Sequence, residues 1–196
     1  MTPPLHPRSW LADAARRLRN DQGSQIAEFA ISLPLLVVMV VGIFDFSGAF
    51  ALKQKLANAA REGARAAAAD PANDLSGVAS GVPVSVSDAF QVVDNYLLAE
   101  KINDCALGGA TITPGSGLTW SATSTGTCPG GGIIFSINRG CVTQQTLAGT
   151  STSMVATCVT ITYPYAWRFN TVSSLLGRTI LGPNNLTTTA VAYNEN

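Results

Sequence analysis

The chain of 196 residues carries 12 basic and 12 acidic side chains, so its formal net charge at pH 7 is zero. This balance excludes the strong basic field through which proteins recruit nucleic acid, and we expect no nucleic-acid partner. Charged residues make up only 12% of the chain and hydrophobic residues 46%, with the apolar excess in one block near the N-terminus.

The apolar block predicts a transmembrane helix that follows a basic leader. Four arginines precede it: Arg8, Arg16, Arg17 and Arg19. No charge occurs from Phe29 to Phe44, which gives about 24 Å of helix against a hydrocarbon core of about 30 Å. Extending the helix to Leu52 covers the core and places Asp45 near the far interface, where a charge costs little. We expect a cytoplasmic leader over residues 1–23 and a transmembrane helix over residues 24–52.

The helical pattern continues past the apolar block and ends at a proline. Small or apolar residues recur on one helical face: Leu52, Leu56, Ala59, Gly63 and Ala66. Asp70 ends the pattern, because the residue before a proline, here Pro71, avoids the helical region. One helix over residues 24–69 would be about 69 Å long, so roughly half of it must stand outside the membrane. We assign residues 53–70 to this extracytoplasmic continuation.

Five positions are expected to shape the packing of this helix: Pro34, Asp45, Ala60, Gly63 and Ala64. Pro34 lies inside the apolar run, where a membrane helix tolerates proline and bends at it. Ala60, Gly63 and Ala64 form a face of small residues that lets another backbone approach closely.

The C-terminal part predicts a small α+β domain over residues 71–196. After a linker over residues 71–83, Ser85-Val86-Ser87-Asp88 has capping-box spacing and predicts a helix from about Val86 to Ile102. Residues 108–132 are rich in Gly, Ser and Thr and indicate loops. Strands are predicted at Leu118–Ala122, Ile133–Ile137, Val155–Tyr165 and Thr187–Tyr193, with a short helix at Leu175-Leu176-Gly177 before the last. The fold class is α+β, with an antiparallel sheet.

Four cysteines lie in the C-terminal half: Cys105, Cys128, Cys141 and Cys158. An even count at wide spacing predicts two disulfides, with three connectivities open, although buried free thiols are an alternative. No close cysteine pair suits a zinc site, and we expect no metal. Basic residues flank the apolar block equally, so the orientation rests on these cysteines, which favour an oxidising compartment for the domain.

Catalytic groups are lacking in the sequence. His6 is the only histidine and precedes the membrane segment, so the exported part has no Ser-His-Asp or Cys-His arrangement. Gly130-Gly131-Gly132 lacks the Lys-Ser/Thr of a phosphate loop. We expect no enzyme and no cofactor.

A secretory signal peptide is a rival interpretation of the N-terminus. Ala49-Phe50-Ala51 matches an A-x-A cleavage site, and cleavage there would release a secreted protein, including a secreted enzyme. Against it, the apolar run exceeds the usual length of about 7–15 residues. Asp45 also falls between that run and the supposed cleavage site.

Residues 21–67 resemble the TadE-like family of pilin-like proteins from tight-adherence secretion systems. The resemblance rests on segments in this order: Gly23, Glu28-Phe29-Ala30, Leu33-Pro34-Leu35, Gly42-Ile43-Phe44-Asp45-Phe46 and Ala59-Ala60-Arg61-Glu62-Gly63-Ala64-Arg65. The family implies a minor pilin or pseudopilin-like structural subunit, which helps assemble a Tad/Flp-type, type IV-like pilus for adhesion or secretion. Implied partners are membrane lipid, other pilin-like subunits, the Tad assembly machinery and a prepilin peptidase.

The resemblance also implies roles for the residues around Gly23. In the wider type IV pilin class the peptidase cuts after this glycine, here between Gly23 and Ser24, on the cytoplasmic face of the bacterial inner membrane. Glu28 then stands at the fifth position of the mature helix and, with Phe29, forms the assembly contact with the amine terminus of a neighbouring subunit. The chain departs from type IV pilins at Ser24, where those proteins have phenylalanine.

An uncleaved single-pass anchor that displays a binding or adhesive domain is the alternative function. Two Ser/Thr-rich stretches, Thr111–Thr127 and Thr143–Thr157, would then form exposed binding loops. A mature N-terminus at Ser24 favours the pilin-like subunit, and one at Met1 favours the anchor.

Overall fold

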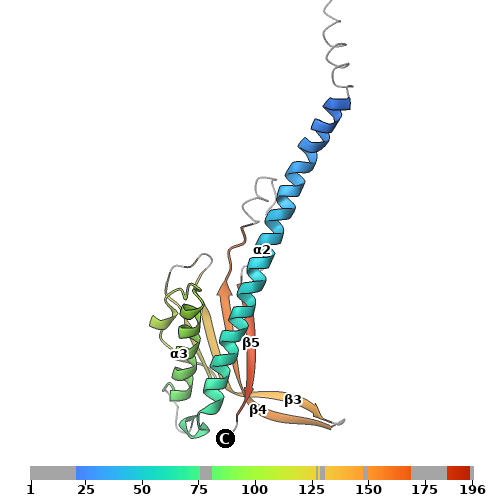
Figure 1. Ribbon diagram of the computed structural model, residues 1–196. Coiled ribbons are helices and arrows are strands. Elements are labelled where there is room, and N and C mark those ends of the chain that lie inside the picture. Colours follow the sequence, from blue (N-terminus) through green and yellow to red (C-terminus); the bar gives the residue numbers. More distant parts are fainter. Residues whose placement is uncertain are drawn as a thin grey trace, which may run out of the picture.

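The computed structural model describes residues 21–75, 81–126, 128, 131–147, 150–168 and 185–194. Helix α2 (Asp21–Ala69) is a single helix of 49 residues, about 74 Å long. Its N-terminal part stands clear, and its C-terminal part lies against α3 and the sheet (Figure 1). The helix ends one residue before Asp70-Pro71, as the sequence predicts. We call the described part from residue 45 onward the body.

The second helix, α3 (Val84–Ala99), starts earlier than predicted because its cap comes from elsewhere in the chain. The capping-box prediction at Ser85 is wrong. Pro83 is the N-cap residue, and its carbonyl accepts the N–H groups of Val86 (3.1 Å) and Ser87 (3.0 Å). The backbone N–H of Ser85 donates to Asp74 Oδ2 at 3.0 Å. Asp74 lies in the short helix η1 (Ala72–Leu75), so a preceding turn supplies the acceptor.

Five antiparallel strands form a meander in chain order after the short helix η2 (Leu107–Gly109). They are β1 (Thr113–Pro114), β2 (Thr119–Thr123), β3 (Ile134–Leu147), β4 (Thr150–Pro164) and β5 (Asn185–Tyr193). The predicted α+β class with an antiparallel sheet is confirmed. The predicted short helix at residues 175–177 lies outside the described residues.

The second Ser/Thr-rich stretch is strand rather than loop, so that prediction is wrong. Residues 143–147 belong to β3 and residues 150–157 to β4, and the two strands pair from Cys141↔Ala156 to Leu147↔Thr150. Threonine is a good strand former because its branched Cβ suits a pleated surface. The two strands extend beyond the rest of the sheet as a projecting hairpin (Figure 1). The first stretch, Thr111–Thr127, contains β1 and β2.

The core lies between the inner face of the sheet and the two helices. Alternate residues of β3 and β4 are fully buried on that face: Phe135, Ile137, Val159 and Ile161. From the helices come small and branched side chains: Leu56, Ala60 and Ala64 of α2, and Val86, Val93 and Leu97 of α3. The rings of Phe90 and Phe135 meet edge to face at 5.4 Å. The C-terminal half of α2 is therefore a core element of the body.

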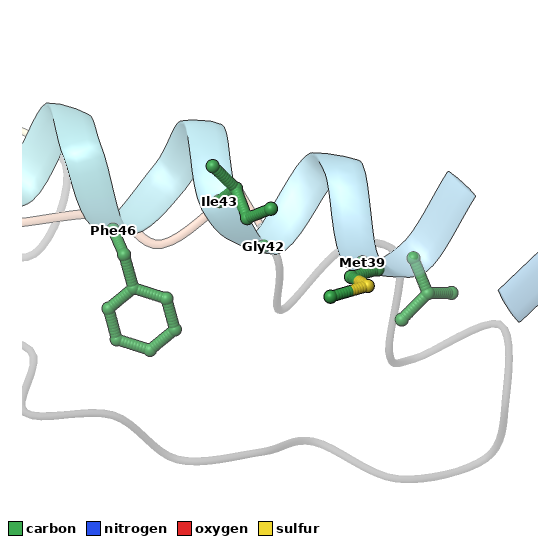
Figure 2. Close-up of a pocket in the computed structure, with 5 residues that line it drawn as sticks. Met39, Gly42, Ile43 and Phe46 are labelled. Carbon is green, nitrogen blue, oxygen red and sulfur yellow. The ribbon is translucent and has the colours of Figure 1, made fainter. Parts of the chain in front are cut away.

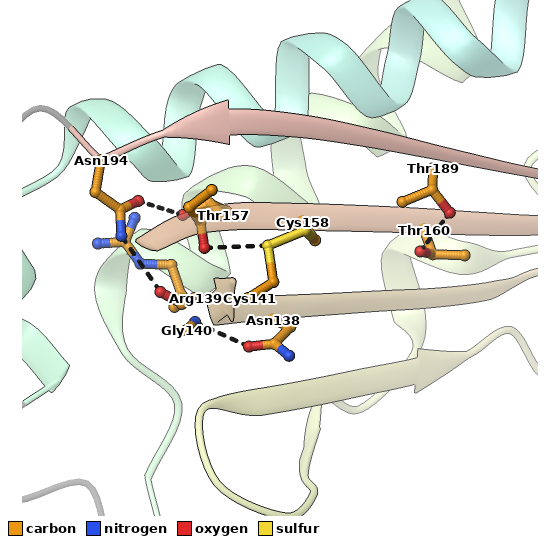
Figure 3. Close-up of a disulfide and its surroundings, with 10 residues drawn as sticks. Asn138, Arg139, Gly140, Cys141, Thr157, Cys158, Thr160, Thr189 and Asn194 are labelled. Carbon is orange, nitrogen blue, oxygen red and sulfur yellow. Dashed lines mark hydrogen bonds between the residues drawn. A yellow bond between two sulfur atoms is a disulfide. The ribbon is translucent and has the colours of Figure 1, made fainter. Parts of the chain in front are cut away.

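Two disulfides tie the body together. Cys105 pairs with Cys128, with Cα atoms 5.6 Å apart, and Cys141 pairs with Cys158, with Cα atoms 6.0 Å apart. The first joins the segment after α3 to the segment before β3. The second links β3 to β4 beside a register shift between Asn138 and Cys141 (Figure 3). This is one of the three connectivities that the sequence left open.

Candidate membrane and assembly interface

The N-terminal half of α2 exposes apolar side chains on every side. None of residues 25–44 is buried, and Ile31 and Phe44 keep 78% and 75% of their surface exposed. Water disfavours a continuous apolar surface of this size, which marks a membrane or protein contact. Within the described residues, this is the one helix long and apolar enough to cross a membrane.

The residues of the expected processing and assembly site lie at the free end of this helix. The backbone is helical at Gly23 and Ser24. Glu28 and Phe29 follow in the next turn, and both are exposed. Pro34 also lies within the helix and is exposed. These positions belong to the N-terminal part of α2, which stands clear of the body (Figure 1).

The small residues of α2 lie in the other half, where α3 approaches closely. Ala60 and Ala64 are fully buried. A Cβ added at Gly63 would lie 2.6 Å from Val93 Cγ2 and 3.3 Å from the Ala89 carbonyl oxygen. Only a residue without a side chain fits this contact between α2 and α3.

Asp45 is the first buried residue along the described side chains of α2, and it is only 4% exposed. The Tyr165 hydroxyl donates to Asp45 Oδ1 at 3.0 Å and lies 3.2 Å from the Asp45 carbonyl oxygen. Burial raises the pKa of Tyr165, and its hydrogen bond to Asp45 raises it further. Tyr165 is therefore a protonated donor at neutral pH.

An aromatic cluster reinforces this contact. The rings of Phe46 and Trp167 lie 5.2 Å apart, and those of Tyr165 and Trp167 meet edge to face at 4.9 Å. Such pairs add about 0.5–1.5 kcal/mol beyond area burial. The segment after β4 is thus held against α2 at residues 45–46. Sequence reasoning gave Asp45 a packing role but found no partner for it, because Tyr165 is 120 positions away.

Two hollows flank α2 near this contact. One, of about 480 Å³, has only apolar lining residues: Val38, Met39, Gly42, Ile43 and Phe46 (Figure 2). The other, of about 560 Å³, lies between α2 and the segment after β4. Asp45 and Arg168 both line this second hollow, which gives it one group of each charge.

Residues 23–65 match the model of the family described as TadE-like protein. The chain carries a TadE-like domain at residues 23–65. No curated protein and no solved structure matches the chain. TadE-like proteins are pilin-like and generally non-enzymatic, and the family implies involvement in Tad pilus assembly. The TadE-like domain covers both the exposed apolar half of α2 and most of its buried half.

Beyond the TadE-like domain, sequence reasoning missed a buried arginine, Arg139, which is 1% exposed. Its Nη2 donates to the Asp70 carbonyl oxygen at 3.2 Å, and its own carbonyl accepts Asn194 Nδ2 at 3.3 Å (Figure 3). Burial lowers the pKa of Arg139, while the charges of Asp74 and Asp70 oppose that shift. Arg139 therefore joins the sheet to the end of α2. A lone arginine within an alternating strand was the available signal.

Within the described ranges, no three His, Cys, Asp or Glu side chains gather as a metal-binding group. Asp94 of α3 has a raised pKa, caused first by burial and then by the charge of Asp104, while a hydrogen bond from the Gly108 backbone opposes the shift. Asp94 and Asp104 thus form a repulsive pair on the body.

Proposed function

We propose that this protein is a minor pilin or pseudopilin-like structural subunit that helps assemble a Tad/Flp-type pilus for adhesion or secretion. One observation carries the proposal. Within the TadE-like domain, a single helix joins an apolar half that is exposed on every side to a half that forms the core of an α+β body. Such a subunit can be held by lipid before assembly and packed against neighbouring helices afterwards.

In this proposal α2 crosses the inner membrane with residues 1–23 in the cytoplasm and the body outside. The disulfides support this orientation, because they persist in oxidising compartments. Asp45 is the first buried residue of α2 and accepts a hydrogen bond from Tyr165, so we put the end of the span at Phe44 rather than at Leu52. Residues 24–44 give about 32 Å of helix, close to a hydrocarbon core of about 30 Å.

We further propose that a prepilin peptidase cuts between Gly23 and Ser24, and that Glu28 and Phe29 then contact the next subunit. A carboxylate costs about 2.5–3.5 kcal/mol at the centre of a membrane helix and less near its end. A protonated amine terminus of an adjacent copy would offset part of that cost. Glu28 in the first turn also complements the helix dipole.

Intact-mass analysis of the protein from native membranes, with pilus preparations from variant strains, tests this proposal. We expect a mature chain that starts at Ser24, and we expect Gly23→Ala to retain the leader. Glu28→Ala should be cut normally yet enter pili poorly. Glu62→Ala is the matched control, because Glu62 is exposed on the same helix and forms an ion pair with the exposed Arg65 at 3.2 Å. Normal incorporation of Glu28→Ala would contradict the assembly role.

The uncleaved anchor remains the second candidate, because the projecting β3–β4 hairpin exposes uncharged residues at positions 142, 144, 146 and 151–155. Two observations would favour that function: an uncleaved, full-length chain in every membrane fraction, and normal pili in a strain that lacks the protein.

A further inference from the structure

The outer sides of α2 and α3 in the body carry opposite charges. The exposed side of α2 has three cations, which we call the α2 cations: Lys53, Arg61 and Arg65. Three carboxylates, one exposed and two half-buried, lie on α3 and just after it, and we call them the α3 carboxylates: Asp88, Asp94 and Asp104. One exposed charge of the opposite sign accompanies each group, Glu62 on α2 and Lys101 after α3. A basic face therefore lies on one helix and an acidic face on the next.

The two faces are not paired with each other within one copy. Within the described residues, two ion pairs involve these helices: Lys55–Glu100 and Arg65–Glu62. Neither joins an α2 cation to an α3 carboxylate. Burial raises the pKa of Asp94, and the charge of Asp104 raises it further. The α3 carboxylates thus meet like charge in the single copy, and a neighbouring cation would relieve that repulsion.

The contacts between α2 and α3 show that the two helices, which lie side by side (Figure 1), run antiparallel. Lys55 Nζ lies 3.0 Å from Glu100 Oε2, and a Cβ at Gly63 would meet Val93. Residue numbers therefore rise along α2 as they fall along α3. Two copies that share one orientation in a membrane must then have the α2 of one antiparallel to the α3 of the other.

At equal height in the membrane, this arrangement sets opposite charges against each other in order. The two contacts above define which residues of α2 and α3 are level. They match the α2 cations to the α3 carboxylates as follows: Lys53 to Asp104, Arg61 to Asp94 and Arg65 to Asp88. Each cation lies within about three residues of the level of its carboxylate, which is less than about 5 Å along the axis. Long Lys and Arg side chains span that offset.

We propose that the α2 cations of one copy dock on the α3 carboxylates of a second copy in the same membrane. This inference deepens the proposed function and rests on its membrane insertion, because insertion gives both copies one orientation. A second copy fits as the partner because each copy carries both faces, with their charges in matching order. Single exposed ion pairs are weak, so the contact depends on several pairs and on the confinement of both copies in one bilayer.

The test uses the full chain, half of it labelled with nitrogen-15, in phosphatidylcholine liposomes. A carbodiimide joins a lysine amine directly to a carboxylate that touches it. Mass spectrometry then identifies hybrid links, which join one labelled copy to one unlabelled copy. We expect a hybrid link between Lys53 and Asp104. Its yield should fall severalfold in about 1 M salt, where charges are screened over roughly 3 Å.

Charge reversal shows whether the two faces recognise each other. Arg65→Glu alone and Asp88→Arg alone should each lower the hybrid yield about fivefold, the scale on which a favourable exposed pair becomes a repulsive one. Both changes in one chain should restore the yield, because the pair forms again with its signs exchanged. Arg65→Lys keeps the charge, so it is the matched control and should leave the yield unchanged.

Several outcomes would overturn the contact. These are links within single copies only, a hybrid yield that charge reversal leaves unchanged, or a double-reversal variant that stays as low as the single ones. A yield that requires phosphatidylglycerol in the liposomes would also overturn it and would make the α2 cations a face for anionic lipid. Alkaline carbonate extraction distinguishes the two proposals. A chain released by carbonate contradicts membrane insertion and the contact together, whereas a retained chain without hybrid links contradicts the contact alone.

Discussion

At the scale of single residues, Gly63 shows how a small side chain determines the packing of α2 against α3. A glycine inside a helix costs about 1 kcal/mol relative to alanine, so propensity alone favours replacement. The structure opposes it, because a Cβ at this position would lie 2.6 Å from Val93 Cγ2. Val93 is fully buried, and its short branched side chain is not the far end of a flexible chain that could swing away.

We therefore predict that Gly63→Ala destabilises the body by about 1–3 kcal/mol, the usual cost of overpacking. Thermal unfolding of the full chain in detergent measures this. Gly48→Ala is the matched control in the same helix, because its Cβ would lie at an ordinary 3.5 Å from the Tyr165 hydroxyl. It should be neutral or stabilising by up to about 1 kcal/mol. Adding Val93→Ala to Gly63→Ala should recover part of the loss, and a full cost in the double variant would contradict the steric cause.

At the scale of elements, the sequence predicts what depends on neighbouring residues and misses what depends on distant ones. The α2 end at Asp70-Pro71 and the alternation around Val159 are local, so both were predictable. The α3 start was not, because its acceptor is Asp74, eleven residues away from Ser85. The β3–β4 hairpin was missed because its Ser, Thr and Gln residues resemble a loop in composition. The contact between Asp45 and Tyr165 could not be predicted either, because the two residues are 120 positions apart.

The Cys141–Cys158 disulfide is expected to stabilise this hairpin at its base. The two cysteines are 17 positions apart, and closing a loop of that length is worth about 3 kcal/mol in the chain-entropy treatment. Beyond the disulfide, β3 residues 141–147 pair with β4 alone, and isolated hairpins are marginally stable.

We predict that the double variant Cys141→Ser, Cys158→Ser increases hydrogen exchange over residues 141–156. Residues 134–138 should stay protected, because β3 is paired there on both sides. Hydrogen-exchange mass spectrometry of the full chain resolves the two regions. Cys105→Ser with Cys128→Ser is the comparison, since that bridge lies outside the hairpin. Equal protection of residues 141–156 with and without the Cys141–Cys158 bridge would show that strand pairing alone holds the hairpin.

At the scale of the whole molecule, the contact between Tyr165 and Asp45 determines how deeply α2 can enter a membrane. The body is attached to the helix from residue 45 onward and cannot enter hydrocarbon with its polar strands. In the proposed insertion, the boundary at Phe44 lies about eight residues, or roughly 12 Å, before the Leu52 limit inferred from hydropathy. The body and the membrane-spanning segment then share one continuous helix, with the transition at the turn of Asp45.

This boundary predicts the accessibility of two serines that differ only in position. Ser32 and Ser47 are both exposed on α2, and serine-to-cysteine replacement changes little in size. In intact membranes, a membrane-impermeant maleimide should label Ser47→Cys and spare Ser32→Cys, because only residue 47 lies beyond Asp45. Both should react after denaturation in SDS, which controls for the reactivity of each thiol. Protection of Ser47→Cys would support the boundary at Leu52 instead. The Asp45–Tyr165 contact would then lie inside the bilayer, which contradicts the boundary proposed here.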